Sequence, residues 1–475
     1  MARLLKRFVS QRNLITGSSL LVVIFLLPAC ASYYQRHWNF NQEFESGDLR
    51  NALETLQRNS REAEGKNRFI YFANKGLLNS ILGDYETSNA AFEKAFLFGE
   101  DFRVNYVNEA VSYLSNPNFS AYRGEDHEHL MVLYFKALNF LKMNRPEEAL
   151  VECRRLNIRL NQLNDKYSSP SKLQRDGFIH MLMGIIYQSV KDYNNAFIAY
   201  RNALSVYEGE YTELFRVEAP LQLKKDLLHM AWRSGFIDEF DHYKEKFNMP
   251  DYTPPDDEAE LVFLWHNGLA PIKDEWGINF VIDHQDNNMA VFTNTSMGMS
   301  FPFQLKDDKE KNDLKSLEVF RVAFPRYLER PLHYDRAVIE TSEGSYPLER
   351  SEDINQIAFH SLRQRMLQEF GKGLLRAALK KATEHSVRKE NDQLGALIGV
   401  MNALTEKADT RSWQTLPHTI YYARVPLKAG PNTIQFKIQN GDQSTYTFSY
   451  QARPGQTLFH TFSSLESKPV AYRFY

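Results

Sequence analysis

The chain has 475 residues, of which 43% are hydrophobic and 24% charged, with a formal net charge of −2 and two cysteines. This length allows two or three domains with sizeable cores. The slightly acidic balance argues against nucleic acid as a partner.

The amino terminus has the charge and hydropathy order of a secretory signal. Four basic and no acidic residues precede an apolar stretch, Leu20 to Leu27, that is too short to span a bilayer stably. The stretch ends in Leu27-Pro28-Ala29-Cys30, which resembles a lipobox. The sequence therefore predicts a lipoprotein signal peptide over residues 1–29 and a lipid (diacylglycerol and palmitate) on Cys30. The alternative is ordinary cleavage near Ala29, which leaves a free thiol.

Cleavage before Cys30 leaves 446 residues with 53 basic and 59 acidic side chains, a net charge of −6. Ala31 and Ser32 follow the cysteine without an aspartate, which in a Gram-negative cell implies sorting to the outer membrane. We expect the protein there on the periplasmic face, with residues 30–39 as a lipidated tether. No later apolar run reaches membrane-spanning length. Only Cys153 remains besides Cys30, so no intrachain disulfide framework is available.

Residues 40–249 have a helical pattern and predict an α-helical, tetratricopeptide-like (TPR-like) solenoid domain. In such a repeat, a small residue on helix A lets helix B approach closely. Two features depart from a regular array. Ser88 occupies the position where helix B of the first strong copy should have an alanine, and the three strong copies are 61 and 47 residues apart, whereas regular repeats are 34 residues apart. Inserted segments are expected, one of them at 104–114. The repeat-like phrases are Gly76 with Gly83-Asp84-Tyr85, Phe92 and Ala95; Ala137 with Ala149 and Leu156; Gly184 with Asp192-Tyr193, Ala196, Tyr200 and Ala203; and weaker copies at Gly47–Ala52 and Gly235–Phe247.

The acidic, proline-rich stretch 250–258 predicts a linker, after which the pattern changes to that of an α+β domain, residues 259–475, with antiparallel strands and two long helices. The domain is expected to end in a β-meander, with Asn440-Gly441 as a turn between alternating segments. The expected strands are Leu261–His266, Ile278–Ile282, Met289–Thr293, Leu317–Ala323 and Ala337–Thr341, and the expected helices are Asp353–Ala382 and Asp392–Lys407.

Several phrases occur together that resemble a family of bacterial tetratricopeptide-repeat-containing outer-membrane lipoproteins whose function is not established. The resemblance covers most of the mature chain and implies no catalytic residues. It also suggests a loose association with lipoprotein activators of penicillin-binding proteins. The phrases are Gly124–His129, Leu138–Leu141, Ala149–Asn157, His266–Lys273 and Ala408–Trp413 with Leu416-Pro417.

Two features attract a chemical interpretation, and for each we favour a structural one. Glu125 to His129 contains good metal ligands, but His127 and His129 would point about 200° apart on a helix, whereas acidic residues suit a first helical turn. Cys153 has no paired His and Asp or Asn, so a buried small hydrophobe is expected. Motifs for a serine hydrolase, zinc protease or phosphate loop are absent, and we expect no metal, no small-molecule cofactor and no enzymatic activity.

The second half of the chain contains one conspicuous cluster with charged side chains, formed by Asp409, Arg411 and Trp413. A bidentate bridge from Arg411 to Asp409 under the Trp413 ring would fix a corner of the domain. The alternative is that the three residues anchor a ligand.

The repeats predict an apolar groove, because helix A positions 2, 5, 9 and 12 face the concave side of a TPR superhelix. Such a surface would not stay exposed on a soluble protein. Either an inserted helix or the second domain covers it within the chain, or a partner helix lies in it. In the two strongest copies the groove positions are Met131, Tyr134, Leu138, Leu141, Phe178, Met181, Ile185 and Gln188; the first copy contributes Ile70, Ala73, Leu77 and Ser80.

Together these features predict a membrane-anchored scaffold or adaptor that binds other envelope proteins through its repeats. Regulation of peptidoglycan synthesis, as an activator-type lipoprotein, is an alternative that differs in the identity of the partner. An envelope enzyme is a third, and it would require at least two of Asp409, Arg411, His266 and Glu340 to converge in an open pocket.

Overall fold

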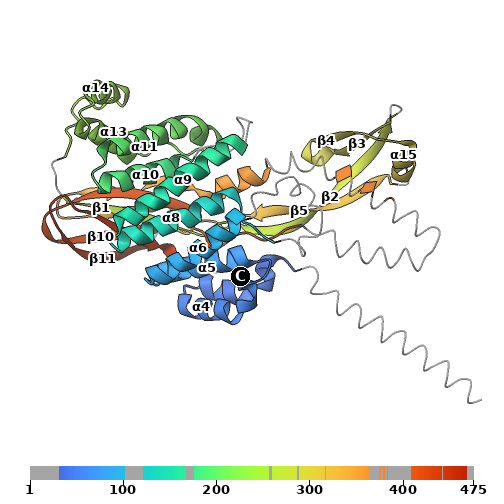
Figure 1. The fold of residues 1–475 in the computed structure, drawn as a ribbon, viewed down its shortest axis with the longest axis horizontal. Helices are drawn as coiled ribbons and strands as arrows, with labels where there is room; N and C mark the ends of the chain where they lie inside the picture. Colours follow the sequence, from blue (N-terminus) through green and yellow to red (C-terminus); the bar gives the residue numbers. More distant parts are fainter. Residues whose placement is uncertain are drawn as a thin grey trace, which may run out of the picture.

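The computed structural model describes residues 31–101, 121–166, 176–255, 259–285, 288–315, 317–363, 408–440 and 442–467, with a few helical residues between 374 and 382. Cys30, the segment 104–114 and the expected helix Asp392–Lys407 lie outside these residues. A layer of helices packs against β-sheets, and a separate sheet extends to one side (Figure 1). In the described part of the chain, no helix is long and apolar enough to cross a membrane.

The helical half consists mainly of antiparallel hairpins that follow one another along the chain: α3–α4, α5–α6, α8–α9, α10–α11 and α13–α14. The helices are α2 (Tyr33–Arg36), α3 (Trp38–Glu45), α4 (Leu49–Arg58), η2 (Ser60–Ala63), α5 (Arg68–Ile81), α6 (Tyr85–Asp101), α8 (Asp126–Lys142), α9 (Pro146–Lys166), α10 (Gly177–Ser189), α11 (Tyr193–Val206), the π-helix η4 (Tyr207–Tyr211), α12 (Thr212–Phe215), α13 (Leu221–Arg233) and α14 (Ile237–Lys246).

The turns of these hairpins share one backbone geometry. Each contains a residue in the left-handed region, with φ between 56° and 86°, followed by a residue whose N–H bonds back to the carbonyl five positions earlier. These bonds satisfy the last carbonyls of the first helix. The left-handed residues are Gly47, Gly83, Asn144, Lys191 and Gly235.

Small residues allow the close helix contacts that the repeat phrases predict. A Cβ on Gly76 would lie 2.5 Å from Phe92, and one on Gly184 would lie 2.5 Å from Tyr200. Ser88 stands where an alanine was expected because its hydroxyl donates a 2.6 Å hydrogen bond to Gly76 O on the partner helix.

Within the described residues, the strands form three four-stranded sheets, with orders β12-β1-β9-β8, β11-β10-β6-β7 and β4-β3-β2-β5. All pairings are antiparallel except that of β1 with β12. The elements are β1 (Ala259–Asn267), β2 (Ile272–Gln285), β3 (Met289–Asn294), η5 (Thr295–Met297), β4 (Met299–Gln304), α15 (Asp308–Leu314), β5 (Val319–Leu328), β6 (Arg336–Glu340), β7 (Ser345–Pro347), β8 (Glu349–Asp353), β9 (Thr419–Leu427), β10 (Gly430–Asn440), β11 (Asp442–Ala452), β12 (Thr457–Ser463) and η6 (Ser464–Glu466).

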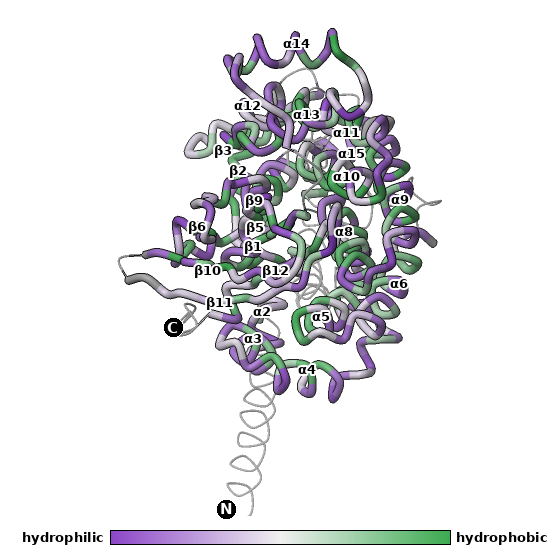
Figure 2. The backbone as a smooth tube through the Cα atoms, turned by 90° about the vertical axis from the view of Figure 1, so that its left-hand side faces the viewer, coloured by the Kyte–Doolittle hydropathy of each residue, from purple (hydrophilic) through white to green (hydrophobic). Residues whose placement is uncertain are grey.

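The sheet that contains β1 is the middle layer of the molecule. Val262 and Leu264 belong to the core shared with the helices, whereas Phe263 and Trp265 belong to a second core shared with the β10 sheet. This alternation follows from the two-residue period of a strand. Figure 2 shows α6, α8 and α9 on one side of the molecule and β6, β10 and β11 on the other.

Two details of the second half differ from the expectation. The β10–β11 hairpin forms as predicted, but β12 does not continue it as a meander; it crosses to the middle sheet and pairs in parallel with β1. Residue 353 ends β8, so the expected helix from Asp353 begins at residue 354 and is described continuously to 363.

The linker also has a structural role. Between α14 and β1, the Tyr252 hydroxyl donates to Lys225 O at 3.1 Å and its ring contacts Phe240. The helical half and the middle sheet therefore share one hydrophobic core across the predicted domain boundary.

Candidate functional site

The predicted groove is covered by the chain itself. All eight predicted groove positions are buried, and two of them bond to the middle sheet. Tyr134 Oη and His266 Nε2 on β1 share a 2.7 Å hydrogen bond, and Gln188 Nε2 donates to Glu260 Oε1 at 3.5 Å. These residues are therefore not an open partner surface in this structure, which corrects the partner-helix alternative.

A buried ionic group fastens the sheet to the helices. Arg424 on β9 pairs with Asp226 of α13 at 3.0 Å and also with Glu260 of β1. The hydroxyl of Tyr422 donates to Asp226 at 2.8 Å. Burial raises the pKa of Asp226, and the neighbouring guanidinium opposes that rise. A paired and fully hydrogen-bonded charge of this kind fixes one docking geometry.

Asp409 and Arg411 form the predicted bidentate bridge, with N···O distances of 2.8 and 2.6 Å. The guanidinium, however, lies 5.3 Å from the Tyr122 ring, and not under Trp413. Trp413 is buried, and its ring contacts Phe92. The cluster lies in a loop between the helices and the sheet, and the bridge joins two residues of that loop.

This loop, residues 409–416, bonds to several helices in turn. Thr410 Oγ1 accepts from Tyr33 N at 2.8 Å, and Trp413 N donates to Glu128 Oε1 at 2.6 Å. The side chains of Gln414 and Thr415 bond to Asn41 and Asn74, both at 2.7 Å.

The stretch Glu125 to His129 starts α8 as predicted, with Glu125 as N-cap. Glu128 Oε2 accepts from Glu125 N at 3.0 Å and from the Tyr122 hydroxyl at 2.8 Å. Burial raises the pKa of Glu128 to about 7, and the adjacent Glu125 adds to the rise. His127 and His129 are buried, and the residues that the structure describes contain no group of His, Cys, Asp and Glu arranged to hold a metal.

The four residues suggested for an enzyme do not line one pocket together; only His266 lines the cavity described below. Asp409 and Arg411 pair with each other, His266 bonds to Tyr134, and Glu340 pairs with Lys437 in a different sheet. Cys153 is buried, and burial raises the pKa of its thiol.

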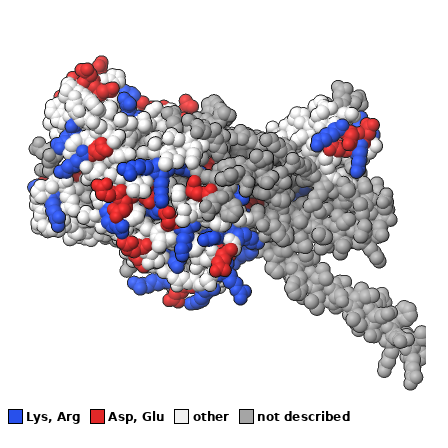
Figure 3. All heavy atoms as spheres, viewed as in Figure 1, with Lys and Arg blue, Asp and Glu red and all other residues white. Residues whose placement is uncertain are grey.

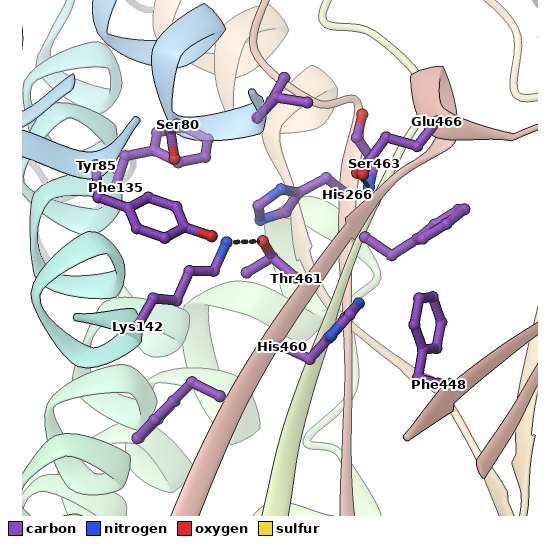
Figure 4. A pocket seen from close by; sticks show the side chains of 13 residues that line it. Ser80, Tyr85, Phe135, Lys142, His266, Phe448, His460, Thr461, Ser463 and Glu466 are labelled. Atoms are coloured by element: carbon purple, nitrogen blue, oxygen red, sulfur yellow. Dashed lines mark hydrogen bonds between the residues drawn. The ribbon is translucent and has the colours of Figure 1, made fainter. Parts of the chain in front are cut away.

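A cavity of about 320 Å³ lies at the seam between the helices and the strands. Lys142 of α8 and Thr461 of β12 point toward each other across it and are hydrogen-bonded, with His266 and His460 on the strand side (Figure 4). Its lining residues are Ser80, Ile81, Tyr85, Phe135, Lys142, His266, Phe448, Phe459, His460, Thr461, Phe462, Ser463 and Glu466. The sequence did not predict this cavity, because its walls come from segments up to 386 positions apart. Of the lining residues, only His266, within the phrase His266–Lys273, was singled out as a candidate for an enzyme site.

No family model matches the chain, and no curated protein matches it. Among solved structures, MamA 41-end from Desulfovibrio magneticus RS-1 is 17% identical with a TM-score of 0.29, over 46% of this chain and 93% of that chain. The MamA RS-1 ArsTM double mutant gives 17% and 0.30 over the same shares. BtubC (BKLC) from P. vanneervenii is 14% identical with a TM-score of 0.32, over 52% of this chain and 92% of that chain. Likeness at these TM-scores carries no argument about fold or function.

Proposed function

We propose that the chain is a lipoprotein of the bacterial outer membrane, anchored at the periplasmic face through Cys30, that acts as a protein–protein interaction scaffold for other envelope proteins. The signal-like amino terminus and the lipobox Leu27–Cys30 support the anchor. A regulator of peptidoglycan synthesis would be a special case of this function with a particular partner.

We also propose that the hairpins are irregular TPR-like repeats of a short solenoid. Their shared turn geometry supports this interpretation, as do the close approaches of Gly76 to Phe92 and of Gly184 to Tyr200. Because the concave face is covered by the chain's own sheet, the partner surface is assigned to the outside of the helical layer.

One observation carries the assignment: the last hairpin has an apolar residue at the position that Asp48, Asp84, Arg145 and Asp192 occupy in the other four. Asp84 and Asp192 cap α6 and α11 by accepting backbone N–H bonds at 3.1 and 3.3 Å. At the equivalent position before α14 stands Phe236, which makes no capping bond and is 38% exposed. Its neighbours Trp232 and Ile237 are 49% and 48% exposed. The last hairpin thus lacks a side-chain cap, which typically stabilises a helix by about 1 kcal/mol, and exposes apolar surface at the same position.

We call Trp232, Phe236 and Ile237 the apolar tip. Exposed aromatic side chains are typical anchors of protein interfaces. In Figure 2 the α14 hairpin lies at the opposite end of the molecule from α3 and α4. The predicted tether 30–39 is too long, because α3 begins at Trp38 and the preceding Tyr33 and Tyr34 are buried. On the face drawn in Figure 3, acidic and basic side chains are intermixed over the helices. The partner is therefore inferred to present an apolar surface, to which an amphipathic helix is suited.

The test is chemical crosslinking in intact cells followed by purification of the full-length chain from membranes. The variant Phe236→Asp with Ile237→Ser restores a capping carboxylate while removing apolar surface. We expect it to lose the partner recovered with the native chain, with an unchanged circular dichroism spectrum. The control Ile158→Ser removes another exposed apolar side chain, on α9, and should retain that partner.

Recovery of the same partner by the tip variant would contradict the assignment. The anchor is tested separately: Cys30→Ser should abolish metabolic incorporation of a palmitate analogue and release the protein from membranes. Incorporation that persists in this variant would disprove lipidation at Cys30.

A further inference from the structure

Lys142, half-buried in the wall of the cavity, has a charge environment that differs from those of two fully buried lysines. Lys136, on the same helix, pairs with Glu152 at 2.9 Å, and Lys273 pairs with Glu125 at 2.8 Å. Lys142 is hydrogen-bonded to the neutral hydroxyl of Thr461, and its ammonium lies 5.1 Å from the Tyr85 ring centroid. No carboxylate of the described residues forms an ion pair with it.

An ammonium inside a cavity without an anion partner is costly, because burial disfavours its charge. Burial lowers the pKa of Lys142 to about 8, although the carboxyl of Glu466 partly opposes this. That carboxyl is already used locally, since it accepts from Ser463 N at 2.7 Å. An anion that entered the cavity would therefore find the cation available at neutral pH.

Glu466 also lines the cavity, and the remaining wall is neutral, with hydroxyl groups and aromatic rings. Burial and, secondarily, Lys142 lower the pKa values of His266 and His460 to about 3, so both imidazoles are uncharged. His460 Nδ1 and the Tyr450 hydroxyl share a 3.0 Å hydrogen bond. Phe135 and Phe448 contribute apolar surface on opposite sides of the cavity (Figure 4).

We propose that this cavity is a binding site for a small organic monocarboxylate with a flat, apolar body. The carboxylate would pair with the Lys142 ammonium and accept from the Thr461 hydroxyl, while the aromatic walls hold the body. Lys142 is the only Lys or Arg among the lining residues, which favours a single negative charge over a phosphate. The volume of about 320 Å³ lies at the lower end of the range for ligand pockets.

The test uses benzoate as the probe, with neutral benzamide and inorganic phosphate as comparisons, by isothermal titration calorimetry on the full chain. We expect saturable benzoate binding with a Kd of about 1 mM or below. Benzamide and phosphate should bind at least about tenfold more weakly. Benzoate binding should weaken as the pH rises above about 8, because Lys142 then loses its proton.

Two lysine variants complete the design. Lys142→Met keeps the apolar stem and should lose benzoate binding at least about tenfold while melting at the same or a higher temperature. Lys94→Met is the matched control: this exposed lysine also lies over an aromatic ring, 5.3 Å from the centroid of Phe72, but outside the cavity. Its affinity for benzoate should be that of the native chain.

Absence of saturable benzoate binding to the native chain, or equal affinities for benzoate and benzamide, would overturn the proposal. So would tighter binding of phosphate, or benzoate binding that survives in Lys142→Met. The comparison of benzoate with benzamide decides the question even where a variant fails to fold.

Discussion

Replacing Asp176 with asparagine should stabilise the protein at neutral pH. Asp176 is the buried N-cap of α10, where its Oδ1 accepts from Ile179 N at 2.9 Å. It faces Glu352 of β8, a second buried carboxyl, to which Tyr211 of the π-helix donates at 3.1 Å. Burial raises the pKa of Asp176 from its ordinary 3.8 to about 6. Asparagine keeps the capping oxygen and removes the charge.

The expected gain follows from the pKa. Folding raises the pKa of this carboxyl from 3.8 to about 6, so the folded state holds the proton more tightly than the unfolded state. Below pH 3.8 the carboxyl therefore costs no stability, and the free energy of unfolding falls as the pH rises from 3.8 to about 6. At about 1.4 kcal/mol per pH unit, the penalty reaches about 3 kcal/mol at pH 8 and about half of that at pH 5. Asp176→Asn should recover these amounts.

Urea unfolding of both proteins at pH 5 and pH 8, followed by circular dichroism at 222 nm, measures the difference. Asp192→Asn is the control, since Asp192 caps α11 at the partly exposed surface where water solvates the carboxylate. It should show no gain at pH 8. A variant Asp176→Asn that is no more stable than the native chain at pH 8, or whose gain is equal at both pH values, would refute the reasoning.

Two further substitutions test the packing. Arg330→Ala should lower the free energy of unfolding by about 3–5 kcal/mol, because the buried carboxylate of Glu45, which pairs with Arg330 at 2.8 Å, loses its cation. Denaturant titration measures this free energy. A loss below about 1 kcal/mol would count against the pairing. Gly184→Ala should lower the free energy of unfolding by about 1–3 kcal/mol, because the added Cβ would lie 2.5 Å from the Tyr200 ring. Gly209→Ala is the control: the added carbon meets open space, so the free energy of unfolding should hardly change. Equal melting temperatures for the two variants would disprove the tight contact.

Local features of the fold were predictable where the pattern has a clear period. The β10–β11 hairpin was predictable because Ile434, Phe436 and Ile438 alternate with polar residues and the sequence Asn-Gly that follows favours a turn. The strand β9 was missed because it is buried on both faces, so its residues do not alternate. The strand β4 was missed although Met299, Phe301 and Phe303 alternate with less apolar residues, because Pro302 argues against a strand.

Long-range arrangements could not be predicted from local patterns. The hydrogen bond between Tyr134 and His266 joins residues that are 132 positions apart in the sequence. The parallel pairing of β1 with β12 requires a crossover connection, which no sequence motif indicates. The apolar character of the groove did indicate that something must cover it, and it left open what does. The Asp409–Arg411 bridge was predictable because its two residues are neighbours, whereas its stacking on Tyr122 was not.

The central claim is that the chain's own sheet covers the apolar face of the helical hairpins. Thiol labelling tests it directly with Leu138→Cys, in a chain whose native thiols are removed by Cys30→Ser and Cys153→Ala. Leu138 is 2% exposed, so its thiol should react with an aqueous disulfide reagent only after unfolding, whereas Ile198→Cys, at a 44% exposed position, should react at once. Rapid labelling of the thiol at position 138 in the folded protein would show that the groove is open and contradict the account.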